Sequence, residues 1–276
     1  MVKKVRDAVA PGSSGLSFLS ESEKVVGWVE SQSWAVNTKK AAYIAFKSVL
    51  RDAGDPSLKA AEDVYNEKML HYRDEHDKNA AKQELSEREK ELYVPWPRIL
   101  RAREKLRLAV SDFMEFQEYV IFCLYTLQPP LRLDFSPMRI VRDPLEKPEK
   151  GNCLLAEPGN YRFLLRDYKT AHKYGELVLD VPDVLEEVLA EWLELNQGEW
   201  LLCDQKGKPL SEVYLGATLR EVMKKAVGRP MGVNMLRHSY ISHQRRGEKS
   251  YLEQKDMAKR MAHSPAISVL YRKLDG

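Results

Sequence analysis

The chain has 276 residues, of which 31% are charged and 43% hydrophobic, and its formal net charge is +3. These values are typical of a globular protein with one large or two smaller domains, and they exclude disorder of the whole chain. The longest near-continuous apolar stretch, residues 120–127, is too short to cross a bilayer, and the basic N-terminus lacks the apolar run of a secretory signal. The cysteines are few, widely spaced and without a CxxC pair, so we expect reduced, buried thiols in an intracellular protein: Cys123, Cys153 and Cys203.

Charge is distributed unevenly along the sequence. Residues 1–100 carry 16 basic and 16 acidic side chains, residues 101–219 carry 15 and 20, and residues 220–276 carry 13 and 5. The basic C-terminal fifth indicates a polyanionic partner such as DNA or RNA, although a solvated basic face fits the same counts.

The first part of the chain predicts a tail followed by a small helical domain. Residues 1–19 are rich in Ser, Gly and Pro without periodicity, which predicts a flexible tail. Apolar residues at helical spacing then predict two helices, separated by Gly54-Asp55-Pro56. Between Arg73 and Glu91, 12 of 19 residues are charged. We therefore expect a helical domain over residues 20–92 that ends in a charged linker at 73–92.

Residues 93–276 predict a second, larger domain. A helix with an apolar stripe ends at Pro129-Pro130 and is followed by three short β-leaning runs, which predict a small antiparallel sheet. Everything after Pro182 reads as helical again. The expected fold class is mainly α with a small antiparallel β-sheet (α+β). The expected strands lie at 153–156, 162–165 and 176–181, and the expected later helices at 183–195, 211–227, 233–247, 251–262 and 265–272.

Four segments of this second domain carry residue types suited to chemistry. They are Pro129–Asp134 (PPLRLD), Tyr168-Lys169-Thr170, Asn234–Ser239 (NMLRHS) and Ala262-His263-Ser264, the last followed by Tyr271. Each has an ordinary reading alone, because an arginine after a proline corner is commonly an exposed charge and most tyrosines are packing residues. Their order along the chain makes the combination informative.

In this order, the segments resemble those of the tyrosine recombinase (integrase) family, in particular its eukaryotic-virus and mobile-element branch. The resemblance covers about residues 95–276, and the helices before it occupy the place of the family's core-binding domain. It implies that Tyr271 attacks a DNA phosphodiester and forms a 3′-phosphotyrosyl intermediate. It also implies that Arg132 and Arg237 hold the phosphate, since guanidinium groups donate forked hydrogen bonds and stay protonated.

The same resemblance gives two further roles. Lys169, in the β-hairpin, would be the general acid for the leaving 5′-oxygen, with Lys173 as the nearest competitor. His263 would donate a hydrogen bond to the scissile phosphate. No metal-ligand spacing, phosphate-binding loop or nucleotide motif is present in the sequence, so we expect an enzyme without a cofactor or metal.

Asn234 departs from the family pattern, which begins its second motif with His in the form His-x-x-Arg. An amide can donate a hydrogen bond to phosphate but cannot accept a proton at neutral pH. His238 follows Arg237 directly and is expected to point about 100° away from it around the helix. Asp134 follows the first arginine and is a weaker candidate for the family's supporting acidic residue.

The expected function is therefore a site-specific tyrosine recombinase or integrase that cleaves and rejoins DNA. A non-catalytic DNA-binding derivative is one alternative, and a hairpin telomere resolvase or type IB topoisomerase-like enzyme is another. The expected partners are double-stranded DNA and further copies of the chain, which assemble on DNA as a dimer or tetramer. No membrane partner is expected, and the protein would work inside the cell wherever its target DNA lies.

Overall fold

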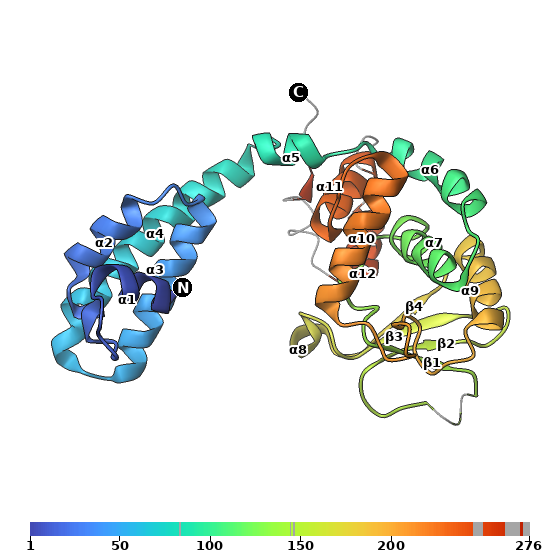
Figure 1. Ribbon diagram of the computed structural model, residues 1–276, viewed down its shortest axis with the longest axis horizontal. Helices are drawn as coiled ribbons and strands as arrows, with labels where there is room; N and C mark the ends of the chain where they lie inside the picture. The colour runs from blue at the N-terminus through green and yellow to red at the C-terminus, as the bar shows by residue number, and fades with distance from the viewer. Residues whose placement is uncertain (83, 144, 146, 245–250, 263–270, 273–276) are drawn as a thin grey trace. The chain divides into compact units, whose positions relative to one another are not determined.

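Figure 1 shows a computed structural model that describes residues 1–82, 84–143, 145, 147–244, 251–262, 271 and 272. The chain divides into two compact units, Met1–Lys82 and Gln83–Gly276, called here the N-terminal and the C-terminal unit. No helix in the described residues is long and apolar enough to cross a membrane.

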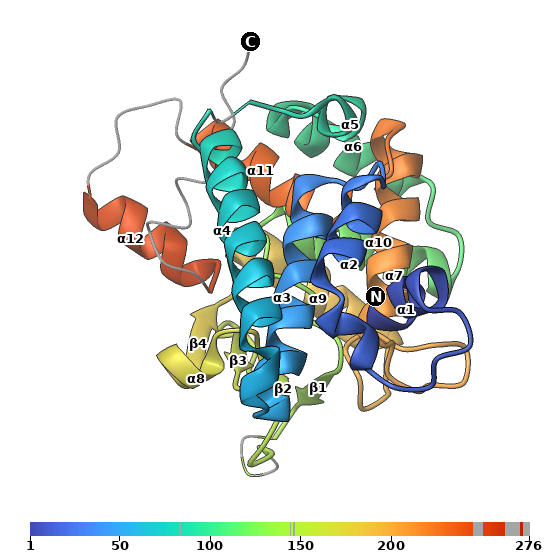
Figure 2. The same cartoon turned by 90° about the vertical axis from the view of Figure 1, so that its left-hand side faces the viewer.

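The N-terminal unit is all helical. Its longest helices are α3 (Val36–Ala53) and α4 (Lys59–Ala81), which lie side by side in Figures 1 and 2. Gly54 ends α3 in the left-handed conformation, with a φ of 66° that suits glycine. The shorter elements are α1 (Val2–Val9), η1 (Ser17–Ser20), α2 (Ser22–Glu30) and η2 (Pro56–Leu58). Aromatic side chains fill much of the core between the helices: Phe18, Tyr43, Phe46, Tyr65 and Tyr72.

The structure differs from the flexible tail expected over residues 1–19. Val5 and Val9 of α1 and Phe18 and Leu19 of η1 are all buried in the core of the N-terminal unit. The Tyr65 hydroxyl also donates a hydrogen bond to the Leu19 carbonyl, at 2.8 Å. The Ser, Gly and Pro residues are concentrated between α1 and η1, and they conceal a short amphipathic helix whose few valines are enough to anchor it.

The boundary between the units comes ten residues before the expected one, because the charged stretch at 73–92 is not a single linker. Its first part, up to Ala81, continues α4. Its last part forms α5 (Glu87–Leu92), which starts with a capping box formed by Ser86 and Glu89. Arg229 Nη1 donates hydrogen bonds to the carbonyls of Lys90 and Glu91, which ties α5 to residues later in the C-terminal unit.

The C-terminal unit is built around α7 (Phe113–Thr126), which is buried on nearly every side. The neighbouring helices α6 (Trp96–Leu108), α9 (Asp183–Leu195) and α10 (Glu212–Val227) contact α7. The expected helices at 183–195 and 211–227 are thus confirmed. The remaining helices are α8 (Ala171–Tyr174), α11 (Val233–Gln244) and α12 (Tyr251–Arg260), and the helix expected at 265–272 falls almost entirely outside the described residues.

In the described residues the sheet has four strands and is mixed, which corrects the antiparallel sheet expected. Its strands lie in the order β1 (Met138–Val141), β2 (Asn152–Leu155), β3 (Arg162–Leu165) and β4 (Leu177–Asp180), at one end of the helices (Figure 1). Strands β2, β3 and β4 pair antiparallel as expected, whereas β1 pairs parallel to β2. A parallel neighbour needs a long connection rather than a tight turn, so no hairpin signal marks β1 in the sequence.

The three cysteines are free and buried, as expected. Burial raises the pKa of the Cys123 thiol to about 12, and it also raises the pKa of Cys153 and Cys203. These thiols are therefore protonated at neutral pH and act as packing groups.

Candidate functional site

A pocket of about 810 Å³ in the C-terminal unit brings together four of the residues singled out in the sequence: Arg132, Asp134, Lys169 and Asn234. They come from three separate segments, namely the corner after α7, the β3–β4 connection and the start of α11. The rest of the lining consists of Arg88, Leu92, Leu133, Asp167, Tyr168, Glu212, Gly216, Arg220, Gly232, Val233 and Met235.

Arg132 is positioned through its backbone. Its carbonyl accepts a hydrogen bond from the buried Tyr125 hydroxyl at 2.8 Å, and its N–H donates to Asp134 Oδ2 at 3.1 Å. Burial raises the pKa of Asp134, although this N–H and the charges of Arg132 and Arg237 lower it. Asp134 thus accepts a hydrogen bond from the backbone of the corner. The Arg132 side chain projects towards the end of α12, where Nη1 donates to the Ala262 carbonyl at 3.5 Å.

Lys169 lies between β3 and β4, on the connection where the sequence analysis expects it, and its side chain is exposed at the pocket. The next residue, Thr170, donates through Oγ1 to the same Ala262 carbonyl at 3.2 Å. The competing Lys173 is on α8 with its ammonium 5.2 Å from the centre of the Tyr174 ring, and it is not part of the pocket lining. The geometry thus favours Lys169 over Lys173.

Arg237, on α11, is fully buried. Its Nη1 donates to the Pro130 carbonyl at 2.5 Å and its Nη2 to the Met261 carbonyl at 3.3 Å, so it joins the proline corner to the end of α12. Its guanidinium carbon lies 5.0 Å from the centre of the Tyr271 ring. Burial lowers the pKa of Arg237, whereas the charge of a nearby Tyr271 phenolate and a side-chain hydrogen bond with Tyr271 raise it.

Asn234 starts α11 and is exposed at the pocket, three residues before Arg237. Arg237 and Tyr271 are not among the residues that line this pocket; they contact one another. The structure therefore brings Arg132, Lys169 and Asn234 to one pocket, and pairs Arg237 with Tyr271. His263 lies outside the described residues.

His238 contacts Tyr271, which the sequence analysis does not predict. Its Nδ1 lies 2.7 Å from the Tyr271 carbonyl oxygen, and the two rings are 5.0 Å apart between centres. Its Nε2 lies 3.9 Å from Glu89 Oε1. Neighbouring residues of α11, Arg237 and His238, thus both contact Tyr271. The place of His238 directly after Arg237 could have suggested a contact with Tyr271, whereas nothing in the charged stretch at 73–92 singles out Glu89.

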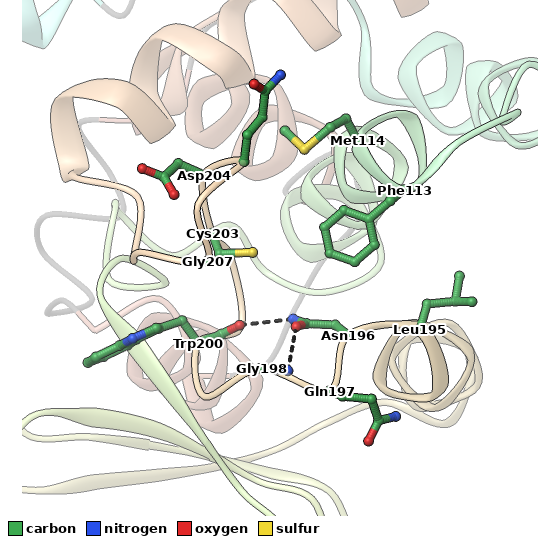
Figure 3. Close-up of a pocket in the computed structure, with 11 residues that line it drawn as sticks. Phe113, Met114, Leu195, Asn196, Gln197, Gly198, Trp200, Cys203, Asp204 and Gly207 are labelled. Carbon is green, nitrogen blue, oxygen red and sulfur yellow. Dashed lines mark hydrogen bonds between the residues drawn. The ribbon is translucent and has the colours of Figure 1, made fainter.

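No three His, Cys, Asp or Glu side chains in the described part of the chain lie close enough together to hold a metal ion. A second pocket of about 420 Å³ lies between the start of α7 and the segment that follows α9. Its lining includes Phe113, Met114, Leu195 and Trp200. In Figure 3, the Asn196 side-chain amide donates a hydrogen bond to the Trp200 carbonyl and accepts one from the Gly198 N–H. None of the predicted site residues lines it.

Comparison with known proteins finds no protein-family model and no curated protein that matches the chain. Among solved structures, the chain is similar to the XerA recombinase, at 14% identity over 70% of this chain, with a TM-score of 0.44. It is also similar to the XerH site-specific recombinase bound to difH substrate in a pre-cleavage complex (18% identity, 97% of this chain and 83% of that one, TM-score 0.44) and to XerH bound to palindromic difH in a post-cleavage complex (16%, 95% and 82%, 0.46). The chain spans 58% of the length of the XerA recombinase chain, and all three are structures of recombinases.

Proposed function

We propose that the chain is a tyrosine recombinase that cleaves and rejoins double-stranded DNA through a 3′-phosphotyrosyl intermediate. The observation that carries this proposal is the Arg237 guanidinium, which is fully buried and lies against Tyr271. Arg237 forms no ion pair with any carboxylate that the structure describes, and its Nη atoms donate to the neutral carbonyls of Pro130 and Met261. A buried cation that is hydrogen-bonded but not neutralised is suited to an anion such as a phosphate.

In the proposed reaction, the Tyr271 hydroxyl releases its proton to solvent as its oxygen attacks phosphorus, and the bond to the 5′-oxygen breaks. Arg132 and Arg237 stabilise the charge that develops on the non-bridging oxygens. Lys169 is exposed at the pocket and protonates the leaving 5′-oxygen. Asn234 donates a hydrogen bond to the phosphate, and His263 would do the same. The new ester retains the energy of the broken bond, so rejoining needs no nucleotide.

The experiment is a covalent-trapping assay on a library of nicked duplexes with a randomised core, since the target sequence is not known. A nick next to the cleavage site lets the short 5′-hydroxyl strand diffuse away, which traps the 3′-phosphotyrosyl adduct on a denaturing gel. We expect an adduct with the wild-type chain and none with Tyr271→Phe. Tyr214→Phe is a matched control, because Tyr214 is an exposed tyrosine on α10, and it should form the adduct normally. An adduct that survives Tyr271→Phe would contradict the assignment of the nucleophile.

Asn234 favours a second candidate, a DNA-binding protein derived from such an enzyme but without catalysis. Its amide lies at the pocket in the position where the resemblance leads us to expect a proton-accepting histidine. This candidate predicts a salt-sensitive mobility shift on duplex DNA with no adduct from any member of the library. The proposed assembly of two or four copies on DNA, and the eukaryotic-virus and mobile-element branch of the family, both stay predictions.

A further inference from the structure

The environment of His238 points to a role that neither the motif nor the pocket assigns. His238 is on α11, its side chain is 15% exposed, and it contacts two segments far away in the sequence. On one side it lies against the ring and the backbone carbonyl of Tyr271, and on the other it faces Glu89 of α5. It therefore links the segment that carries the proposed nucleophile to a helix of the C-terminal unit.

The contact with Tyr271 determines which ring nitrogen of His238 carries a proton. A backbone carbonyl oxygen can only accept, so Nδ1 must donate the hydrogen bond to Tyr271 O at 2.7 Å. With Nδ1 protonated, a neutral ring would present the lone pair of Nε2 to the Glu89 carboxylate. Nε2 faces Glu89 Oε1 at 3.9 Å, so the carboxylate lies beside the ring nitrogen that does not contact Tyr271.

Glu89 is itself held in place. Its Oε2 accepts hydrogen bonds from the Ser86 N–H at 2.9 Å and from the Ser86 hydroxyl at 2.8 Å, which leaves Oε1 towards His238. The helix that carries it is anchored by Arg229, which binds carbonyls of the same helix. A chain of contacts thus runs from the start of α5 through Glu89 and His238 to Tyr271.

We propose that His238, oriented by Glu89, is a positioning residue that holds Tyr271 in the orientation for attack. The Arg237 guanidinium and the His238 imidazole each lie 5.0 Å from the centre of the Tyr271 ring, and the Tyr271 backbone carbonyl is held by His238 Nδ1. This assignment rests on the proposed function of Tyr271. Its physical basis is that a displacement of about 1 Å in a reacting group slows chemistry by about 100-fold.

Two amide substitutions at His238 separate its two nitrogens. In His238→Asn the side-chain NH₂ falls close to the position of Nδ1 and can still donate to the Tyr271 carbonyl, whereas in His238→Gln it falls close to Nε2 and faces Glu89. We expect the single-turnover rate constant for adduct formation at saturating DNA to fall about 3- to 10-fold for His238→Asn, which loses only the Glu89 contact, and at least about 30-fold for His238→Gln, which loses the donor to Tyr271. DNA affinity should change less than 2-fold in both. Equal rates in the two variants would overturn the proposal.

A second pair of variants tests the Glu89 contact. Glu89→Gln keeps an oxygen for Ser86 and removes the negative charge, and we expect a rate constant about 3- to 10-fold lower with an unchanged melting temperature. Glu87→Gln, on the same helix and with a side chain that is 89% exposed, is the matched control and should cleave at the wild-type rate. A wild-type rate in Glu89→Gln would remove Glu89 from the proposal.

A readout without catalysis distinguishes this proposal from the proposed function. In ¹H–¹⁵N spectra tuned to histidine side chains, wild-type protein should show a slowly exchanging Nδ1–H of His238 that disappears in His238→Asn. If this signal is present and no adduct forms on any DNA, the recombinase function fails while the His238 contact stands. If adducts form and the signal is missing, the positioning role is wrong and the proposed function stands.

Discussion

Replacing Arg237 by lysine tests whether the buried guanidinium is needed for its shape or only for its charge. The arginine satisfies two separate acceptors, the carbonyls of Pro130 and Met261. A lysine side chain has a single nitrogen and can donate to only one of these carbonyls. The other buried carbonyl loses its donor, which lowers the free energy of unfolding by about 1–3 kcal/mol. For a unit of this size that lowers the melting temperature by about 2–12 °C. The variant should still fold.

The catalytic effect should exceed the effect on stability. The ammonium cannot keep the carbonyls and also present a fork to phosphate, so we expect adduct formation to slow by about 10²–10³-fold, as when one donor to a transition-state oxyanion is removed. The assay is single-turnover trapping at 25 °C, alongside a thermal melt followed by near-ultraviolet circular dichroism. Arg101→Lys, at an exposed arginine of α6, is the control and should alter neither measurement. Cleavage by Arg237→Lys within 3-fold of wild type would refute the reasoning.

Three further predictions follow from contacts in the C-terminal unit. Lys169→Ala should slow strand cleavage by at least about 10²-fold and be rescued by a substrate with a 5′-phosphorothiolate leaving group, which needs no proton, whereas Lys173→Ala should cleave normally; equal losses would contradict the choice of Lys169. Burial raises the pKa of Asp134, so at pH 7 its charged carboxylate makes the folded state less stable than a neutral side chain would. In urea unfolding at pH 7, Asp134→Asn should therefore be more stable than wild type, and this difference should vanish as the pH falls below about 3.8, where the wild-type carboxyl is neutral too. The buried Gln117 amide bonds both the N–H and the carbonyl of Cys203, at 2.8 and 2.9 Å, so Gln117→Met should lose about 2–4 kcal/mol in urea unfolding, and a loss below 1 kcal/mol would contradict this.

The sequence predicts elements well where local pattern and packing agree. Helix α9 spans Asp183–Leu195, the range expected, because it follows Pro182 directly and carries an apolar stripe along its whole length. Strand β1 could not be predicted, because it pairs parallel to β2 across a long connection rather than through a tight hairpin turn. Helix α1 was obscured by the Gly and Ser residues that follow it.

In the candidate site, too, the sequence predicts what depends on local pattern and misses what depends on tertiary packing. The motifs predict which residue types gather, and the structure brings Arg132, Lys169 and Asn234 to one pocket. A helical wheel gives the direction of His238 relative to Arg237, but it cannot show what fills that direction. The partner of His238 on the other side is Glu89, 149 positions earlier in the chain, and contacts over such distances depend on tertiary packing alone.

The carbonyl of Ala262 is a shared acceptor with a consequence for ligand binding. It accepts from Arg132 Nη1 and from Thr170 Oγ1, and Ala262 has a φ of 51°, a left-handed conformation that costs a non-glycine residue about 1–2 kcal/mol. An anion that binds Arg132 competes with this carbonyl, so its binding energy is reduced by the contact it displaces. The β3–β4 connection that carries Lys169 is hydrogen-bonded to the same oxygen through Thr170. Anion binding in the pocket and the position of the end of α12 are therefore thermodynamically linked, and the coupling free energy is the same in both directions.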